Sequence, residues 1–445
     1  MPFLHLNADL SAWIFALAST LDKRSSPRLA LLLLGALFAK GRRTVTSWFR
    51  AGGITDEFRP AYNALGSAGR REDRIGARLL YLVLAPIMRL VPGKRLLFGI
   101  DDTPTKRYGR CIQGAGIHHN PTPGPAGEKH CYGHIWVTLA WLAPHPLFGI
   151  VALPLRALLY VREKDVPELN KETPWTFRTK LELAVELVRW LLIWLVRAGK
   201  VVWVVADGAY ANAPFLKPLI AKGVVVVSRL RCNAHLSSMP QPKRQGQPGP
   251  APTYGKKRVS LAKRAGQKGG WQSVTCVQYG ERVVKTVKTF LATWRPAGGA
   301  IRVVLVQEED GWVAFFCTDT TASVQDILEA MAARGAIEQT FKDVKEVWGA
   351  QQQQVRHVYA CVGAFNLNLW MFSLVEAWAW NRSEEELSDR SRCPWDSEPR
   401  RPSHADKRKA LQRETLRAEI EAVLKGRPSK GEFRALAERL LDLAA

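Results

Sequence analysis

The 445-residue sequence predicts an α/β fold in which helices cover both faces of a mixed β-sheet. One observation is the uninterrupted run of β-branched and aromatic residues from 201 to 205, which is typical of a strand buried on both faces. A second is the helical spacing of apolar residues between Trp175 and Ala198, directly before that strand. A third is the apolar fraction of 47%, which is ample for a buried core.

Residues 1–94 predict a helical, basic region that binds DNA. Apolar clusters alternate there with basic patches, and the segment carries 14 Lys or Arg against 6 acidic residues. The stretch from Lys40 to Arg50 predicts a short DNA-contacting helix with Thr44 or Thr46 as its N-cap. A solvated basic face is an equally good interpretation of the same stretch.

Residues 95–230 predict the first part of the sheet. The expected order is three strands, a helix, a strand, a helix and a strand, and it is the order of a ribonuclease-H-like mixed sheet. The expected strands are 96–100, 135–142, 149–160, 201–205 and 224–227, and the expected helices are 175–198 and 213–222.

Residues 231–320 predict a basic, β-rich insertion with a return strand to the core. Residues 229–302 contain 15 Lys or Arg and a single acid, Glu281, and residues 240–252 have the Pro, Gly and Gln content of a loop. We expect this insertion to bind DNA phosphates. Its expected DNA-binding residues are Lys256, Lys257 and Arg258, and its expected strands are 273–279, 283–289, 301–307 and 312–318.

Helical spacing returns over residues 324–348 and 358–380, so we expect residues 321–382 to complete the core. Residues 383–445 mix acids and bases and are largely helical from 406 to 443. This charged helical C-terminal tail is expected to be a solvated or partner-binding appendage.

The formal net charge of +24 indicates a polyanionic partner, for which nucleic acid is the leading candidate and a membrane surface the rival. Apolar runs are too short or too interrupted for a membrane span, and no signal peptide is expected. The seven cysteines are scattered without a C-x-x-C pair, which indicates reduced thiols. We therefore expect a cytoplasmic, nucleoid-associated protein without a membrane partner.

Three acidic positions predict a catalytic site for phosphodiester chemistry. Asp101 or Asp102 ends the first core strand, Asp207 ends the fourth, and Glu338 lies on a late helix. Two divalent ions about 4 Å apart, held by convergent carboxylates, position the attacking and leaving oxygens of such a reaction. Adjacent strand residues point to opposite faces, so only one of Asp101 and Asp102 can face the ions.

The late helix has a testable spacing, because Arg334, Glu338 and Lys345 fall on one narrow stripe at 100° per residue. An ordinary salt-bridged helix face is the alternative interpretation. This Arg-x(3)-Glu-x(6)-Lys pattern resembles part of the Y-(2)-R-(3)-E-(6)-K signature of DDE transposases of bacterial insertion sequences, families four and 701. Asp102-Thr103 resembles the first-aspartate pair of those enzymes, and residues 204–210 resemble the strand end that supplies their second aspartate. The similarity covers roughly residues 95–380.

The resemblance implies a cut-and-paste DNA transposase. Its catalytic and metal-binding residues would be Asp102, Asp207 and Glu338, holding two Mg²⁺ or Mn²⁺ ions; Asp102 is preferred over Asp101 because Thr103 follows it. Arg334 and Lys345 would hold the DNA backbone. The partners would be double-stranded DNA, as terminal inverted repeats and target, and a second copy of the chain on DNA. One departure is Met331 at the tyrosine position of the signature, which puts DNA-end contacts in doubt more than catalysis.

Two other functions remain open from the sequence. One is a ribonuclease-H-like nuclease without strand transfer, and the other is a decayed or domesticated protein that only binds DNA. A cluster of Cys and His residues between 111 and 134 has spacings that match no familiar zinc finger, and we expect it to serve hydrogen bonding near the site or to phosphates.

Overall fold

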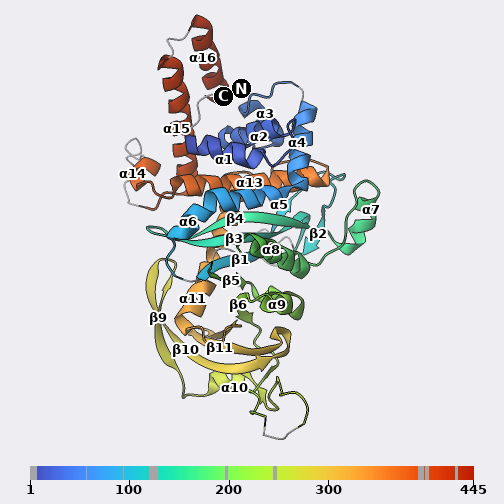
Figure 1. Ribbon diagram of the computed structural model, residues 1–445, viewed down its shortest axis with the longest axis vertical. Coiled ribbons are helices and arrows are strands. Elements are labelled where there is room, and N and C mark those ends of the chain that lie inside the picture. Colours follow the sequence, from blue (N-terminus) through green and yellow to red (C-terminus); the bar gives the residue numbers. More distant parts are fainter. Residues whose placement is uncertain are drawn as a thin grey trace.

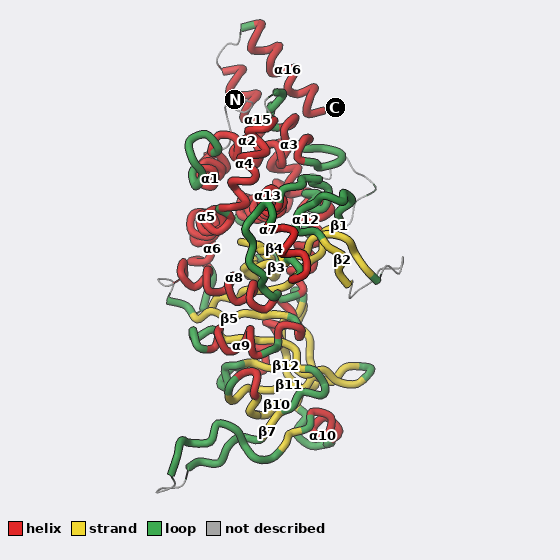
Figure 2. Tube along the Cα trace, turned by 90° about the vertical axis from the view of Figure 1, so that its right-hand side faces the viewer, coloured by secondary structure: helices red, strands yellow, loops and turns green. Residues whose placement is uncertain are grey.

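One mixed sheet of twelve strands forms the centre of the described part of the chain (Figure 1). The computed structural model describes residues 8–56, 58–93, 95–119, 129–195, 199–243, 248–388, 395, 400–425 and 429–444. The molecule is elongated, with the N- and C-terminal helices gathered at one end and β7 and α10 toward the other (Figure 2). The ribonuclease-H-like α/β fold that the sequence predicts is therefore confirmed.

The N-terminal region is helical, as expected. Thr44 caps α3 and accepts a hydrogen bond from the backbone N–H of Ser47 at 3.2 Å, which confirms the predicted short helix and one of its two candidate caps. A π-helical turn, η1, joins two α-helices near the end of the region. The elements are α1 (Ala8–Ala18), α2 (Ser26–Phe38), α3 (Val45–Ala51), α4 (Phe58–Arg70), α5 (Glu72–Arg78), η1 (Leu79–Leu84) and α6 (Ala85–Leu90).

The first half of the sheet contains all five strands expected there, and β2 in addition. β1 lies between antiparallel β3 and parallel β5, and β5 pairs in parallel with β6. The short β2 was not predicted, because its four residues have no alternating apolar pattern. The strands are β1 (Arg95–Lys106), β2 (Gly116–His119), β3 (His130–His145), β4 (Gly149–Tyr160), β5 (Val201–Ala206) and β6 (Val225–Leu230).

The β-rich segment continues the same sheet. β12 pairs antiparallel with β6, and β11, β10, β7 and β8 follow in order, with β9 paired to β10. The insertion therefore extends the core sheet by backbone hydrogen bonds. Its strands are β7 (Leu236–Ser237), β8 (Arg258–Val259), β9 (Gln272–Gln278), β10 (Glu281–Trp294), β11 (Gly299–Glu308) and β12 (Gly311–Cys317).

The two faces of the sheet carry different helices. α8 packs against β3 and β4, whereas α11 and α12 cover an apolar cluster on the other face that includes Ala140, Trp203, Val205 and Ile337. The helices and short turns in this half are η2 (Glu163–Asp165), α7 (Val166–Asn170), α8 (Lys180–Leu195), η3 (Gly208–Tyr210), α9 (Ala213–Ile220), α10 (Leu261–Gly266), η4 (Arg295–Ala297), α11 (Val324–Ala333) and α12 (Gly335–Glu346).

The predicted helix over 324–348 is divided at Arg334. Arg334 ends α11 and begins α12, and its carbonyl accepts from the N–H of Ile337, three residues on, at 2.9 Å. Gly335 follows at once, and glycine is among the weakest helix formers. The sequence periodicity continues through this break, so it did not predict the division.

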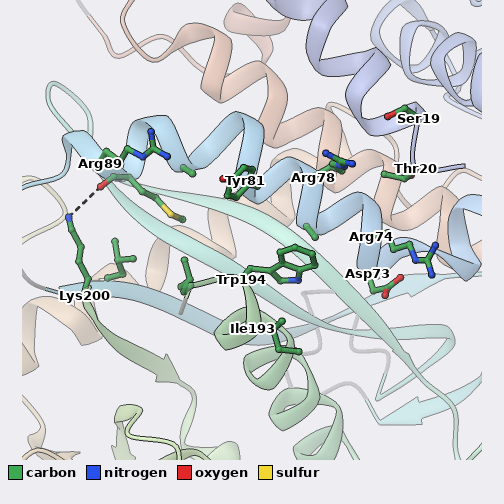
Figure 3. Close-up of a pocket in the computed structure, with 15 residues that line it drawn as sticks. Ser19, Thr20, Asp73, Arg74, Arg78, Tyr81, Arg89, Ile193, Trp194 and Lys200 are labelled. Carbon is green, nitrogen blue, oxygen red and sulfur yellow. Dashed lines mark hydrogen bonds between the residues drawn. The ribbon is translucent and has the colours of Figure 1, made fainter. Parts of the chain in front are cut away.

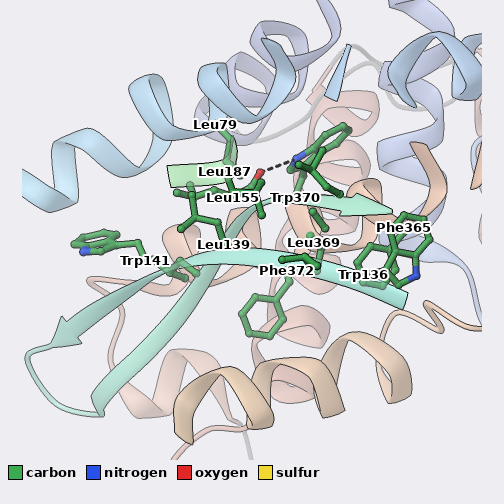
Figure 4. Packing of buried hydrophobic residues seen from close by; sticks show 14 of the residues in the cluster. Leu79, Trp136, Leu139, Trp141, Leu155, Leu187, Phe365, Leu369, Trp370 and Phe372 are labelled. Carbon is green, nitrogen blue, oxygen red and sulfur yellow. Dashed lines mark hydrogen bonds between the residues drawn. The ribbon is translucent and has the colours of Figure 1, made fainter. Parts of the chain in front are cut away.

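Helix α13 (Val358–Ala379) covers the edge strand β4. Asn366 accepts from the N–H of Ala157 at 2.9 Å and donates to the Ala157 carbonyl at 3.0 Å. These two backbone groups of the edge strand would otherwise lack hydrogen-bond partners. Trp370 donates to the Leu155 carbonyl at 3.1 Å, near Phe365 and Trp136, whose rings stack (Figure 4). Among the described helices, α13 alone is long and apolar enough to cross a membrane, but 94% of its most apolar window is buried inside the protein.

The C-terminal segment differs from the solvated or partner-binding appendage that we expected, because one side of α15, which includes Lys407, Arg408 and Leu411, is buried. The Arg408 guanidinium donates to the carbonyls of Leu37 and Val347 at 2.8 and 2.7 Å. Glu376 of α13 pairs with Lys407 at 2.5 Å, and both side chains are buried. Charged residues here therefore anchor the tail to the core. The remaining helices are α14 (Glu384–Leu387), α15 (His404–Lys425) and α16 (Lys430–Ala444).

Candidate active site

Two of the predicted acids follow directly after the last paired residues of the parallel strands β1 and β5, although β1 itself continues to Lys106. Ile100 pairs with Ala206, so Asp101 and Asp207 are the next residues on neighbouring strands. Side chains at matched positions of paired strands lie on the same face. Asp207 follows Trp203 and Val205 at alternate positions, and both of these belong to the cluster covered by α11 and α12. Asp101 and Asp207 therefore share the face on which α12 packs.

The carboxylate of Asp101 is mostly buried and has one strong counter-ion. Its Oδ2 lies 2.6 Å from the guanidinium of Arg334, and its Oδ1 accepts from the backbone N–H of Asp102 at 2.9 Å. Burial raises the pKa of Asp101 to about 6, against the lowering effect of Arg334, and the charges of Asp102 and Asp207 raise it further. Arg334 alone therefore does not offset the cost of burying the Asp101 charge, and a bound cation would stabilise the ionised carboxylate.

Glu338 reaches this group of residues through Arg334. The same guanidinium lies 2.8 Å from Glu338 Oε1, four residues along the chain, and thus bridges Asp101 and Glu338. The Glu338 side chain is 63% exposed, which leaves it accessible to a ligand. The predicted Arg334–Glu338 stripe is present in the structure, although a helix break falls at its first residue.

Gly99 allows α12 to lie this close to β1. A Cβ atom at Gly99 would stand 2.2 Å from Cδ1 of Ile337, the residue before Glu338. Gly99 is two positions before Asp101 and shares its face. The absence of a side chain at Gly99 thus brings the helix that carries Glu338 against the strand that carries Asp101.

Asp102, our preferred first acid from the sequence, faces the other side of the sheet. Its Oδ2 lies 2.7 Å from Nζ of Lys180, at the start of α8, and its Oδ1 accepts from the hydroxyl of Tyr210 at 2.9 Å. Burial and the Asp102 charge raise the pKa of Tyr210, so its hydroxyl stays a donor. The geometry thus favours Asp101 over Asp102, because strand residues alternate and only Asp101 points toward α12.

Three residues of this site were missed from the sequence. Lys180 and Tyr210 had no signal that joined them to Asp102, since they lie 78 and 108 positions away in the chain. Thr138 lies opposite Asp101 in the β1–β3 register, and its Oγ1 is buried with no hydrogen-bond partner among the described residues. That hydroxyl is a further oxygen donor beside Asp101.

The remaining predicted DNA-binding residues lie away from the acids. Lys345 is in the last turn of α12, where burial lowers its pKa against the opposing effect of the Cys131 thiol. Lys256, Lys257 and Arg258 are exposed beside β8, at the last position of the sheet order. The structure therefore brings Arg334 to the acids but not the other four cations.

The tyrosine position of the helix signature, Met331, packs against the cluster under α11. A different tyrosine lies near the start of α12: Tyr279, at the tip of the β9–β10 hairpin, stands 3.1 Å from where a Cβ of Gly335 would lie. Tyr279 is 83% exposed and has a φ of 54°. In two-residue hairpin turns such a positive φ is usually adopted by Asn or Gly. An aromatic ring is thus available beside Arg334 from another element.

The donor types suit a hard divalent cation, which prefers carboxylate and other oxygen ligands. Buried Asp101, neighbouring Asp207 and the free hydroxyl of Thr138 supply such donors on one face. Within the described ranges, no three His, Cys, Asp or Glu side chains stand close enough together to hold a metal ion. Glu338 is engaged by Arg334, so it would have to leave that partner to complete an ion site.

The Cys and His cluster between residues 111 and 134 is represented by His134, which has a structural role. Its Nδ1 accepts from Nε of Arg107 at 3.0 Å, so its Nε2 is the nitrogen that donates to the Gln113 carbonyl at 3.0 Å. Burial and the Arg107 charge lower the pKa of His134 to about 3. This neutral ring joins β3 to the loop after β1.

A family model described as DDE superfamily endonuclease matches residues 16–295, which is more than half of the chain. The match includes Asp101, Asp102 and Asp207 but ends before Arg334 and Glu338. Among curated proteins, none matches the chain.

Proposed function

Because the chain belongs to the DDE superfamily endonucleases, we propose that it is a DNA transposase of the insertion-sequence type, related to families four and 701. It would cut phosphodiester bonds at transposon ends and join the resulting 3′-hydroxyl to target DNA. Enzymes of this superfamily act on DNA and generally use divalent metal ions. The finer activity, strand transfer by a cut-and-paste route, is our proposal.

One observation carries the proposal: Asp101, Asp207 and the Arg334–Glu338 pair lie on the same face of the sheet. The contacts support Asp101, rather than Asp102, as the first acid. Asp102 pairs with Lys180 and Tyr210 on the opposite face, so we assign it to holding β1 against α8 and η3.

The three acids would hold two divalent ions, Mg²⁺ or Mn²⁺. Such ions, when bound, polarise the phosphate and stabilise the attacking and leaving oxygens of an in-line displacement. Asp101 and Asp207 would supply the fixed side of the site, because strands hold them. Glu338 would supply the adjustable side, because its side chain is largely exposed.

Arg334 would then turn from the carboxylates to the DNA. Its forked guanidinium suits bidentate hydrogen bonding to a phosphate. The exposed cations Lys256, Lys257 and Arg258 would hold the DNA farther along the sheet, since phosphate contacts fix position without reading sequence. The predicted role of Lys345 on the backbone is a proposal of the same kind.

The expected partners are terminal inverted repeats, target DNA and a second copy of the chain, because two DNA ends must be cut together. The expected place of action is the nucleoid in the cytoplasm. The net charge of +24 supports a DNA partner over an uncharged one. No membrane partner is proposed.

The test combines purified protein with DNA from the flanks of its gene and Mg²⁺ or Mn²⁺. Wild type is compared with Asp207→Ala and Glu338→Ala, and with Lys425→Ala on α15 as an exposed control. We expect metal-dependent nicking and joined products from wild type and the control, and neither from the acid variants. Nicking that survives both acid substitutions would contradict the site.

The same experiment separates the two other functions. Nicked DNA without joined products would identify a nuclease that lacks strand transfer. Binding of the DNA ends without any nicking would identify a decayed or domesticated DNA-binding protein.

A further inference from the structure

A large groove lies between the N-terminal helices and the end of α8, apart from the acids (Figure 3). Its volume is about 1300 Å³. α5, η1 and α6 form one wall, and the last turn of α8 with the start of β5 forms the other. Leu96 and Lys200, at the starts of β1 and β5, line it. Asp101 lies five residues beyond Leu96 along β1, about 17 Å away at the usual rise per residue, and Asp207 lies just past the far end of β5.

The groove is cationic, with four basic side chains and one acid, Asp73. Arg74, Arg78 and Arg89 are exposed, and none of their side chains makes a hydrogen bond or ion pair with another described residue. Lys200 is the exception, because its amine donates to the Val91 carbonyl at 2.7 Å and to that of Met88 at 3.4 Å. Three guanidinium groups are therefore available to an anionic ligand.

Exposed rings lie among these cations. Tyr81 is 59% exposed and Trp194 is 46% exposed, although large aromatic side chains are usually well buried. Tyr81 belongs to the π-helical turn η1, and such turns occur frequently at functional sites. Figure 3 shows Tyr81 near Arg78 on one wall and Trp194 on the other. The groove thus offers flat apolar surfaces between positive charges.

Cations interleaved with exposed rings are the chemistry of single-stranded nucleic acid binding, in which bases stack on rings and phosphates meet the charges. A duplex uses only the cations, because its bases already stack on one another. Two rings on facing walls therefore favour an unpaired strand over a duplex.

We propose that this groove binds a single-stranded DNA segment, with bases stacked on Tyr81 and Trp194 and phosphates held by Arg74, Arg78 and Arg89. The proposal rests on the proposed function only in taking DNA as the ligand. It assigns the groove no part in bond cleavage, because Asp101 and Asp207 lie farther along the same strands.

The test measures binding of a fluorescein-labelled oligothymidylate to the full chain by anisotropy, in EDTA and over a series of salt concentrations. We expect Tyr81→Ala and Trp194→Ala each to weaken binding about fivefold or more, the lower range for loss of one stacked base. Arg78→Ala should reduce the slope of log affinity against log salt by about 0.7, the value for one phosphate of a single strand.

Matched controls are Lys425→Ala on α15 and Phe433→Ala on α16, which remove an exposed cation and an exposed aromatic ring far along the chain. Both should bind as wild type does. Wild-type protein that binds the oligonucleotide but does not nick the DNA from the flanks of its gene would count against the proposed active site and not against the groove. Thermal unfolding of every variant checks that it is folded.

Three results would overturn the proposal. The first is wild-type affinity in both ring variants. The second is that only Arg78→Ala weakens oligothymidylate binding and that it weakens duplex binding equally. This result would indicate a site that binds phosphates without base stacking. The third is a mass by light scattering that falls in Trp194→Ala, which would identify the groove as a contact between two copies of the chain.

Discussion

Asp101 and Asp102 are neighbours in β1, yet they lie in different surroundings on the two faces of the sheet. Asp101 is turned toward α12, has a raised pKa and is bridged by Arg334 to Glu338. Asp102 is turned toward α8 and receives one hydrogen bond from Lys180 and one from Tyr210. The partners of each acid, and therefore its charge environment, are thus set by the helix packed on its face of the sheet and not by its place in the sequence.

The largest expected effect separates the two acids in catalysis. Asp101→Asn should lower the metal-dependent nicking rate about a thousandfold or more, because loss of an ion ligand removes several kcal/mol of transition-state stabilisation. Asp102→Asn should lower it by about tenfold at most, since it weakens only the contacts with Lys180 and Tyr210 on the other face. Single-turnover nicking rates at saturating Mn²⁺ measure both. Equal rates in the two variants would remove the distinction.

The next effect concerns pH and the stability of the metal-free protein. The folded-state pKa of Asp101 is raised from 3.8 to about 6, so the folded protein binds more protons than the unfolded chain between these values. Stability should therefore fall as pH rises through about 6, by up to about 3 kcal/mol. Urea unfolding in EDTA, below and above pH 6, measures this loss.

Asp101→Asn should remove that part of the pH dependence, whereas Asp102→Asn should keep it. If the pH dependence of stability disappeared in Asp102→Asn and stayed in Asp101→Asn, the carboxyl with the raised pKa would be Asp102, on the α8 face.

A third comparison concerns the cation on each face. Arg334→Ala leaves the mostly buried Asp101 without its counter-ion, and we expect a loss of about 2 kcal/mol in EDTA. Lys180→Ala should cost less than about 1 kcal/mol, because that pair is more exposed and Asp102 keeps Tyr210. Added Mn²⁺ should restore stability to the Arg334 variant only. Denaturant unfolding with and without Mn²⁺ gives these differences.

The smallest effect tests the close contact between β1 and α12. Gly99→Ala should cost about 1 to 2 kcal/mol, because the new methyl group overlaps the end of the Ile337 side chain, which can move in part. Ile337→Val, which removes that terminal methyl group, should recover most of the loss in the double variant. Thermal unfolding of the two single variants and the double variant measures these stability losses. If the loss in the double variant equals the sum of the two single losses, residues 99 and 337 do not contact each other.

Much of the fold was predictable because strong local patterns determined it. Runs such as residues 201–205 fixed the buried strands, and Thr44 marked a helix start. The break at Arg334 was not predictable, because apolar spacing continues through it. The burial of Lys407 and Arg408 was also missed, since mixed charge in a sequence usually indicates a solvated helix.

The sequence predicted the three acidic positions of the site, but it did not predict which of Asp101 and Asp102 lies on the face with the other two acids. Alternation along a strand showed that either Asp101 or Asp102 must turn away, and only the packing of α12 over Gly99 indicates which. The partners Lys180, Tyr210 and Thr138 come from separate elements, and no spacing in the sequence joins them to the acids.

We propose that Asp101, Asp207 and Glu338 form one cation site on the α12 face of the sheet. Anomalous diffraction from crystals grown with Mn²⁺ would locate the ion. We expect anomalous density bounded by Asp101 and Asp207, with Glu338 turned from Arg334 toward the ion. Density beside Asp102, Lys180 and Tyr210, with none near Asp101, would contradict it.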